Sequence, residues 1–146
     1  MGVDDSMDEA SLPNLDNLAQ RERIIPVSAA ELEGIHEMAL VAARAAASVK
    51  AEDVKVLDMH ELVTYTDYLV ICTGRNARLT KRIAEEVAFR TKEQFKLIPK
   101  SVEGAASGDW ILVDFIDFML HVFTPEARDF YRLDVLWKQA PAEEIE

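Results

Sequence analysis

The stretch SGDWILVDFIDFMLHVF, residues 107–123, decides how this chain folds. It consists of two apolar runs, 110–115 and 117–123, which meet at a bend that carries Asp114 and Asp117. Two apolar runs of this length around a short bend are typical of two strands joined by a turn. We therefore predict an antiparallel β-hairpin.

Both faces of the predicted hairpin are largely apolar. Side chains alternate between the two faces of a strand. On the first strand, Trp110, Leu112 and Asp114 face opposite to Ile111, Val113 and Phe115, and on the second, Met119, His121 and Phe123 face opposite to Phe118, Leu120 and Val122. A sheet that is apolar on both faces needs cover on both, or else leaves one patch for a partner.

Helices and strands on both sides of the hairpin complete the predicted fold. Residues 28–31, Ser-Ala-Ala-Glu, have the form of a capping box, and apolar residues follow at helical spacing. We therefore predict a first helix that begins here. A second helix is predicted over 77–95 with Asn76 as its N-cap, and a last helix over 125–137. Further strands are predicted over 53–59, 67–74 and 96–104. The order αββαβββα predicts an α/β fold with a mixed sheet of about five strands flanked by helices.

The chain is acidic, with 27 Asp and Glu against 16 Lys and Arg and a net charge of -11. This charge disfavours DNA and RNA, because binding to their backbone depends on Lys and Arg that release counterions. A basic protein is the better electrostatic partner. Residues 1–27 lack sustained periodicity and predict an acidic, flexible or loosely docked arm. Residues 28–138 form the predicted domain, and 139–146 an acidic tail.

Several classes of protein are disfavoured. No stretch reaches the roughly 18 uninterrupted apolar residues of a membrane span, and the acidic start MGVDDSMDEA is unlike a signal peptide. We therefore expect a cytoplasmic protein. Cys72, the single cysteine, excludes an internal disulfide and is predicted to be a buried small hydrophobe. His36, His60 and His121 are far apart and show no metal-binding spacing, so no metal site is expected.

An ordered set of motifs resembles a known family. The set comprises DYLVICTG (67–74), EG (103–104), DWILVDF (109–115) with Asp117, HVF (121–123) and ARDFYRLDVLW (127–137). In this order they resemble the ribosomal silencing factors, also called Iojap-like proteins, over residues 28–138.

The resemblance implies an α/β fold related in outline to nucleotidyltransferases, and a function without catalysis or cofactor. It implies binding to the large ribosomal subunit through one basic ribosomal protein, the universal one numbered fourteen. Binding there sterically blocks association with the small subunit and represses translation. Organelle relatives imply an alternative, a role in large-subunit assembly without silencing.

The nucleotidyltransferase outline leaves an enzyme as a further alternative. Nucleotidyl transfer needs carboxylates that hold Mg²⁺, usually as an Asp-x-Asp pair after a Gly-Ser helix start. Residues 74–76, Gly-Arg-Asn, are the nearest analogue of that start, and the sequence holds no Asp-x-Asp. Asp114 and Asp117 are instead expected to cap the bend or to pair with a cation. We therefore expect no catalytic residues.

Aromatic side chains with a polar group are common at the centres of interfaces, although the same residues also fit a core. The hairpin and the last helix supply the expected partner-binding residues: Trp110, Met119, His121, Phe123, Arg128 and Tyr131. Arg128 is expected to reach Asp114 or Glu103, or else to face the partner. The same apolar surface would permit a homodimer away from the ribosome.

Turn and cap roles are expected for polar residues and glycines at the ends of elements: Asp67, Gly74, Asn76, Glu103, Gly104, Asp114 and Asp117. The bend departs from the family pattern, because Ile116 stands where glycine is usual and a β-branched residue is strained at positive φ. Arg75, Arg78, Lys81 and Arg82 crowd the start of the second predicted helix. They are expected to form a solvated face, with RNA contact a minor alternative.

Overall fold

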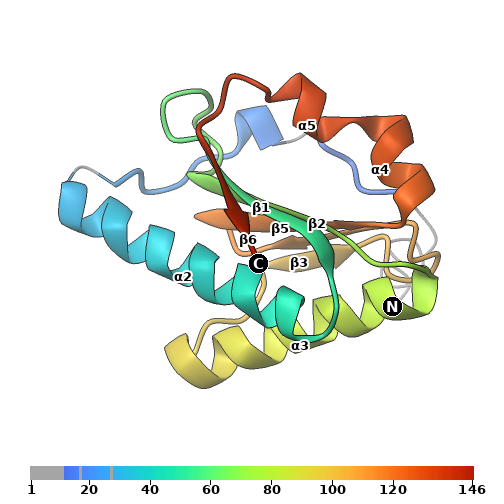
Figure 1. Ribbon diagram of the computed structural model, residues 1–146. Helices are drawn as coiled ribbons and strands as arrows, with labels where there is room; N and C mark the ends of the chain where they lie inside the picture. Colours follow the sequence, from blue (N-terminus) through green and yellow to red (C-terminus); the bar gives the residue numbers. More distant parts are fainter. Residues whose placement is uncertain (1–11, 17, 27) are drawn as a thin grey trace, which may run out of the picture.

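The computed structural model describes residues 12–16, 18–26 and 28–146. Its centre is a six-stranded mixed sheet in the order β3-β4-β5-β2-β1-β6 (Figure 1). The strands are β1 (Glu52–Asp58), β2 (Tyr68–Thr73), β3 (Ser101–Glu103), β4 (Trp110–Asp114), β5 (Phe118–Phe123) and β6 (Ala142–Ile145). The helices are η1 (Leu18–Gln20), α2 (Ala29–Ser48), α3 (Ala77–Phe95), α4 (Pro125–Tyr131) and α5 (Leu133–Leu136).

One parallel pair lies at the middle of the sheet. β2 and β5 run parallel, with Tyr68 opposite Phe118 and Thr73 opposite Phe123. The pairs β1–β2, β1–β6, β3–β4 and β4–β5 are antiparallel. The mixed sheet flanked by helices confirms the predicted fold class.

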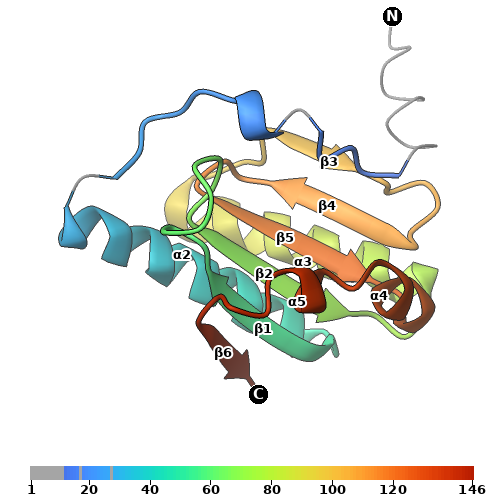
Figure 2. The ribbon, with the colours of Figure 1, turned by 90° about the horizontal axis from the view of Figure 1, so that it is seen from above.

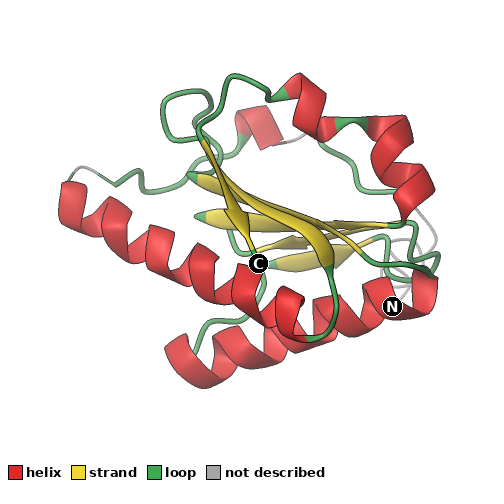
Figure 3. Cartoon of the chain, viewed as in Figure 1, coloured by secondary structure: helices red, strands yellow, loops and turns green. Residues whose placement is uncertain are grey.

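The two long helices cover one face of the sheet, which we call the first face (Figure 3). Ser28 and Glu31 form the capping box of α2. The buried stripe of α2 consists largely of alanines, whose small side chains let the helix pack closely. The core of this face comprises Ala39, Ala42, Ala46, Val56, Val70, Ile83, Val87, Ile111, Val113, Phe118, Leu120 and Val122, among others.

The opposite side, which we call the second face, is covered by shorter elements. Figure 2 looks onto it and shows α4, α5 and η1 there; the chain before η1 runs near β3, and the chain after η1 leads away from β3 toward α2. The buried residues of this face are Leu57, Met59, Leu69, Ile71, Trp110, Leu112, Met119, Phe123, Ala127, Leu133 and Ala140. Leu15, Leu18, Val63, Tyr65, Tyr131 and Trp137 pack against them.

The hairpin between β4 and β5 closes through a very tight turn. Asp117 N donates to the carbonyl of Phe115 at 2.9 Å, and Ile116 between them has a φ of 74°. A hydrogen bond from i+2 to i around a residue at this φ is the pattern of the rare γ-turn, which is strained for a non-glycine residue. Asp114 Oδ1 accepts from Ile116 N at 2.8 Å, which stabilises the bend.

Three expectations about the chain ends need correction. The predicted last helix is two short helices, because Arg132 adopts a left-handed φ of 54° between α4 and α5. The predicted acidic tail contains β6, which pairs with β1, so the folded body extends beyond residue 138. The predicted loose arm is docked through buried arginines over its described part, 12–16 and 18–26. Residues 1–11, 17 and 27 of that arm lie outside the described residues.

Candidate partner-binding surface

The second face contains an aromatic cluster, which we define as Trp110, His121, Phe123 and Tyr131. β4 and β5 place the first three on one side of the hairpin, and α4 adds Tyr131. The ring centroid of Trp110 lies 5.2 Å from that of Phe123 and 4.7 Å from that of Tyr131. Such distances are typical of attractive aromatic pairs. The cluster therefore fixes α4 on the sheet.

His121 is the one titratable member of the cluster that is fully enclosed. Trp110 Nε1 donates a hydrogen bond to His121 Nδ1 at 3.0 Å, so Nδ1 is an acceptor and the ring is neutral. Burial lowers the pKa of His121 to about 4, although nearby Asp114 acts in the opposite direction. His121 is thus a neutral hydrogen-bonding residue of the core.

Near the bend, three carboxylates form a second group, the carboxylate cluster, defined as Asp67, Asp114 and Asp117. Arg21 Nη1 lies 2.6 Å from Asp114 Oδ2. Arg23 holds Asp67 through two hydrogen bonds of 2.8 and 3.0 Å, and Asp117 through one of 2.9 Å. Bidentate guanidinium–carboxylate pairs are among the strongest hydrogen bonds in proteins. Two arginines from before α2 therefore pair with three acids from the start of β2 and from the β4–β5 bend.

Backbone carbonyls complete the binding of both guanidinium groups. Arg21 donates to the carbonyls of Tyr65 and Ile116, and Arg23 donates to that of Thr64. The Arg23 side chain is only 3% exposed. Burial raises the pKa of Asp117, and its ion pair with Arg23 opposes that rise. The site thus binds two guanidinium groups through carboxylates and backbone carbonyls.

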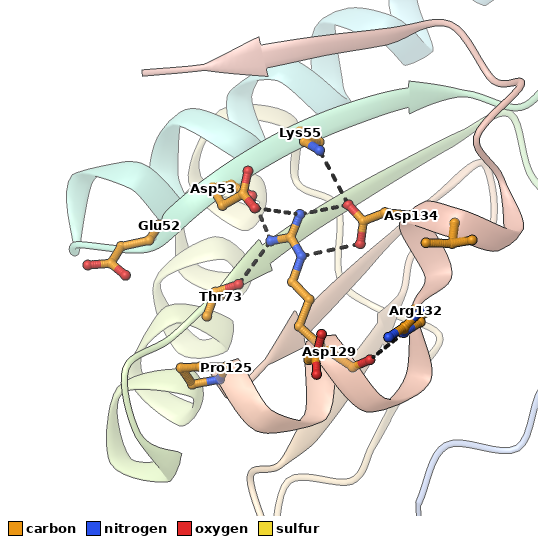
Figure 4. Close-up of a pocket in the computed structure, with 10 residues that line it drawn as sticks. Glu52, Asp53, Lys55, Thr73, Pro125, Asp129, Arg132 and Asp134 are labelled. Carbon is orange, nitrogen blue, oxygen red and sulfur yellow. Dashed lines mark hydrogen bonds and ion pairs between the residues drawn. The ribbon is translucent and has the colours of Figure 1, made fainter.

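Arg128 has another role than expected, because it points toward β1 and β2 instead of the hairpin. Its Nη2 lies 2.8 Å from Asp134 Oδ2 and 3.3 Å from Asp53 Oδ2, and its Nη1 donates to Thr73 Oγ1 at 2.9 Å. These partners surround a hollow of about 540 Å³ (Figure 4). Lys55 also pairs with Asp134, at 3.5 Å. Arg128 therefore binds α4 to the ends of β1 and β2, and does not reach Asp114 or Glu103.

The residues expected at turns and caps occupy tight local sites. Asn76 Oδ1 accepts from Leu79 N at the start of α3. Gly74 lies so close to α3 that a Cβ there would be 2.9 Å from Thr80 N. At Gly104, where φ is 82°, a Cβ would lie 2.0 Å from the carbonyl oxygen of Trp110. Glu103 accepts a hydrogen bond from Asn14 N at 2.8 Å.

Most of the expected partner-binding residues are buried in this structure. Trp110, Met119, His121 and Phe123 are at most 5% exposed. Tyr131 is partly exposed, and the Arg128 side chain is 10% exposed. A partner can therefore reach the aromatic cluster only at its edge, unless the chain segments that cover it move.

Apolar residues on the outer side of α4 and α5 are exposed, which the sequence did not predict. Phe130 is 76% exposed, and Val135 and Leu136 are also exposed. The sequence predicted one continuous helix over residues 125–137, running through Phe130, Leu133 and Trp137. The left-handed Arg132 breaks that periodicity, so that Leu133 is buried while Phe130 faces solvent. The signal that could have revealed this is the high share of apolar residues on so short a helical stretch.

The described residues include no group of three or more His, Cys, Asp or Glu that could hold a metal ion. Burial raises the pKa of the Cys72 thiol to about 12, so this residue is a thiol packed in the core. No helix of the described chain is both long enough and apolar enough to cross a bilayer.

Comparison with known proteins identifies the family of this chain. The family model described as "ribosomal silencing factor during starvation" matches residues 32–146. The chain belongs to the ribosomal silencing factor family. The ribosomal silencing factor RsfS of Bacillus subtilis is 34% identical over 106 residues, which cover 73% of this chain and 89% of that protein. The family predicted from the motifs is thereby confirmed.

A more distant relative and a solved structure extend the comparison. The protein of Mus musculus named mitochondrial assembly of ribosomal large subunit protein 1 is 33% identical over 92 residues, which cover 60% of this chain and 39% of that protein. A crystal structure of a protein from Bacillus halodurans matches with a TM-score of 0.66 and 32% identity. That match covers 75% of this chain and 99% of the other. The silencing-factor fold therefore accounts for about three quarters of the chain.

Proposed function

We propose that this protein binds the large ribosomal subunit through the basic universal ribosomal protein numbered fourteen, sterically blocks association with the small subunit and so represses translation. The observation that carries the proposal is the family match, which spans the folded body from residue 32 to 146. The relative from Bacillus subtilis bears the name of a ribosomal silencing factor.

The second face is the proposed binding surface. Its helices α4 and α5 expose the apolar side chains Phe130, Val135 and Leu136, and Phe130 lies edge-on against Tyr131 of the aromatic cluster. Exposed apolar side chains are common anchors of interfaces, and the acidic net charge of the chain favours encounter with a basic protein. The net charge of -11 supports a protein partner over RNA.

The proposed role is not catalytic. Asp114 and Asp117 are the acids nearest to a paired arrangement in the hairpin, and both are held by arginine side chains. While Arg21 and Arg23 are docked, neither carboxylate is available to hold Mg²⁺ against a triphosphate. The cellular compartment in which this protein acts is a separate question, because ribosomes also occur in mitochondria and the relative from Mus musculus is named mitochondrial. The cytoplasm therefore stays a prediction, as does pairing of two copies through the second face.

A large-subunit assembly factor is the second candidate, and the name of the mouse relative favours it. Co-sedimentation separates the two functions. The purified protein is mixed with separated mature large and small subunits, and the missing subunit is then added. We expect it to pellet with the large subunit alone and to suppress joining. Binding without suppression would favour assembly, and binding to neither subunit would overturn both candidates.

A pair of substitutions tests the proposed surface. Phe130→Ala removes an exposed side chain from α4, so it should weaken binding to the large subunit by roughly tenfold if Phe130 is an anchor. Phe89→Ala is the matched control, because Phe89 is 57% exposed on α3 beside the first face. Binding is measured by sedimentation across a concentration series. Equal affinities of the two variants would remove Phe130 from the interface.

A further inference from the structure

The N-terminal segment, defined as residues 12–16 and 18–26, lies outside the family match. That match begins at residue 32. The protein from Bacillus halodurans is covered over 99% of its length by 75% of this chain, so about a quarter of this chain has no counterpart there. The acids that receive Arg21 and Arg23 all lie inside the match, at positions 67, 114 and 117. The family body thus supplies the receptor, and an additional segment supplies the arginines.

Side chains attach this segment to the body. Leu15 and Leu18 pack on the apolar core of the second face. Asn14 N donates to Glu103 Oε1, and the two arginines enter the carboxylate cluster. Along the described segment, the backbone–backbone hydrogen bonds are local, from Leu18 to Leu15 and from Arg21 to Leu18, and none joins it to the body.

An attachment of this kind can open without unfolding the body. A strand in a sheet leaves only when its ladder of backbone hydrogen bonds breaks, whereas here a few side chains leave together. The last part of the segment adds little to the attachment, since Ile24 is 92% exposed and Ile25 is also exposed. On release, the three carboxylates would gain water and could accept other cations.

We propose that the N-terminal segment is a detachable cover of the second face, and that its two arginines occupy the site where an arginine-bearing stretch of the basic ribosomal partner binds. This inference rests on the proposed function. The observed occupant shows which chemistry the site accepts: two guanidinium groups, with carboxylates and backbone carbonyls as acceptors. RNA phosphates would meet three carboxylates and be repelled.

The cover makes the affinity for the ribosome depend on how often it is open. When a partner binds only the open form, the apparent Kd is the intrinsic Kd divided by the open fraction. Changes that loosen the segment should therefore tighten ribosome binding, although they remove contacts within the protein. A segment that serves only to stabilise the fold would give the opposite result.

The test uses the full chain and changes only the segment. Leu18→Asp places a carboxylate against the apolar second face and should loosen the cover. Ile24→Asp adds the same charge at a side chain that contacts little, so it is the matched control. Asn14→Pro, which removes the N–H donor to Glu103, is a second loosening variant. Hydrogen exchange of the Leu18 and Arg21 amides, which donate the backbone hydrogen bonds of the segment, measures opening independently of any ribosome.

We expect Leu18→Asp and Asn14→Pro to speed exchange in the segment, and Leu18→Asp to tighten large-subunit binding by roughly fivefold. Ile24→Asp should match the wild type in both measurements. Faster exchange with unchanged or weaker binding would overturn the cover while leaving the proposed function intact. Exchange that stays slow in both loosening variants would overturn it as well. If neither the wild type nor any variant binds the large subunit, although exchange shows that the segment opens, the proposed function is wrong, and the assignment of the partner is wrong with it.

A peptide competition tests the role of the arginines. A synthetic peptide of residues 12–26 should displace Leu18→Asp protein from the large subunit. The same peptide with both arginines replaced by alanine should compete far less. Equal competition by the two peptides would show that the guanidinium groups do not define the site, and would overturn that part of the proposal.

Discussion

Trp110 and His121 show how two residues with polar groups become part of an apolar core. Each lies on one strand of the hairpin, and the indole N–H meets the imidazole Nδ1 at 3.0 Å. Because the donor of one satisfies the acceptor of the other, neither leaves an unpaired polar atom at that contact. The pair therefore depends on the imidazole staying neutral, which ties the stability of the second face to pH.

His121→Gln should reduce the pH dependence of folding. The pKa of His121 is lowered by burial to about 4, below its unfolded value, so protons bind the unfolded chain more tightly. Its stabilising contribution is complete above about pH 6.5 and is lost as pH falls toward 4. Between pH 7 and pH 5 the wild type should lose about 2 kcal/mol through this residue. Glutamine does not titrate, so the variant should lose less over that interval.

Urea unfolding at the two pH values measures this difference. The control is Tyr131→Phe, which keeps His121 and should retain the pH dependence of the wild type. Parallel pH profiles for wild type and His121→Gln would show that His121 is not neutral and buried in the manner described.

At the scale of elements, the turn that joins β4 and β5 contains a residue with a strained backbone, Ile116. Ile116, at a φ of 74°, stands in a conformation that glycine adopts at little cost. Ile116→Gly and Ile116→Ala remove the same partly buried side chain, but only glycine relieves the backbone. We expect the glycine variant to have a free energy of unfolding about 1 kcal/mol above that of the alanine variant. Chemical denaturation of the two proteins gives the comparison directly, and a more stable alanine variant would contradict the strained turn.

Elements with a local signal could be predicted from the sequence. The capping box of α2, the Asn76 cap of α3 and the alternation in β4 and β5 are patterns within a few residues. β6 lacked such a signal, because Ala142–Ile145 is largely exposed and acidic and becomes a strand only by pairing with the edge of β1. The break at Arg132 was also hidden, since arginine ordinarily favours a helix.

At the scale of the whole molecule, the attachment of the N-terminal segment could not be read from the sequence. Arg23 is separated from Asp67 by 44 positions and from Asp117 by 94. Two arginines within an acidic stretch are typical of a solvated arm, and no local pattern predicts a distant partner. The same holds for the candidate surface. Its aromatic residues could be predicted from the sequence, but their burial by segments distant in the sequence could not.

Arg23 and Arg128 provide the last prediction, because both hold carboxylates but belong to different parts of the molecule. Arg128 lies in α4 within the body, and its side chain is 10% exposed, against 3% for Arg23. From burial alone, Arg23→Ala should be the more damaging change, since an unpaired buried carboxylate is costly. If the N-terminal segment detaches, however, Asp67 regains water and the cost is limited to the free energy that docks the segment.

We therefore expect Arg23→Ala to lower the free energy of unfolding by about 1 kcal/mol, and Arg128→Ala by about 2–3 kcal/mol, because Thr73, Asp134 and the Asp53 carbonyl belong to the body and stay in place around the lost guanidinium. Denaturant unfolding monitored by tryptophan fluorescence compares the two, with both Trp110 and Trp137 in or against the core of the second face. The reverse order would mean that the segment is an integral part of the fold, held to the body as firmly as α4 is.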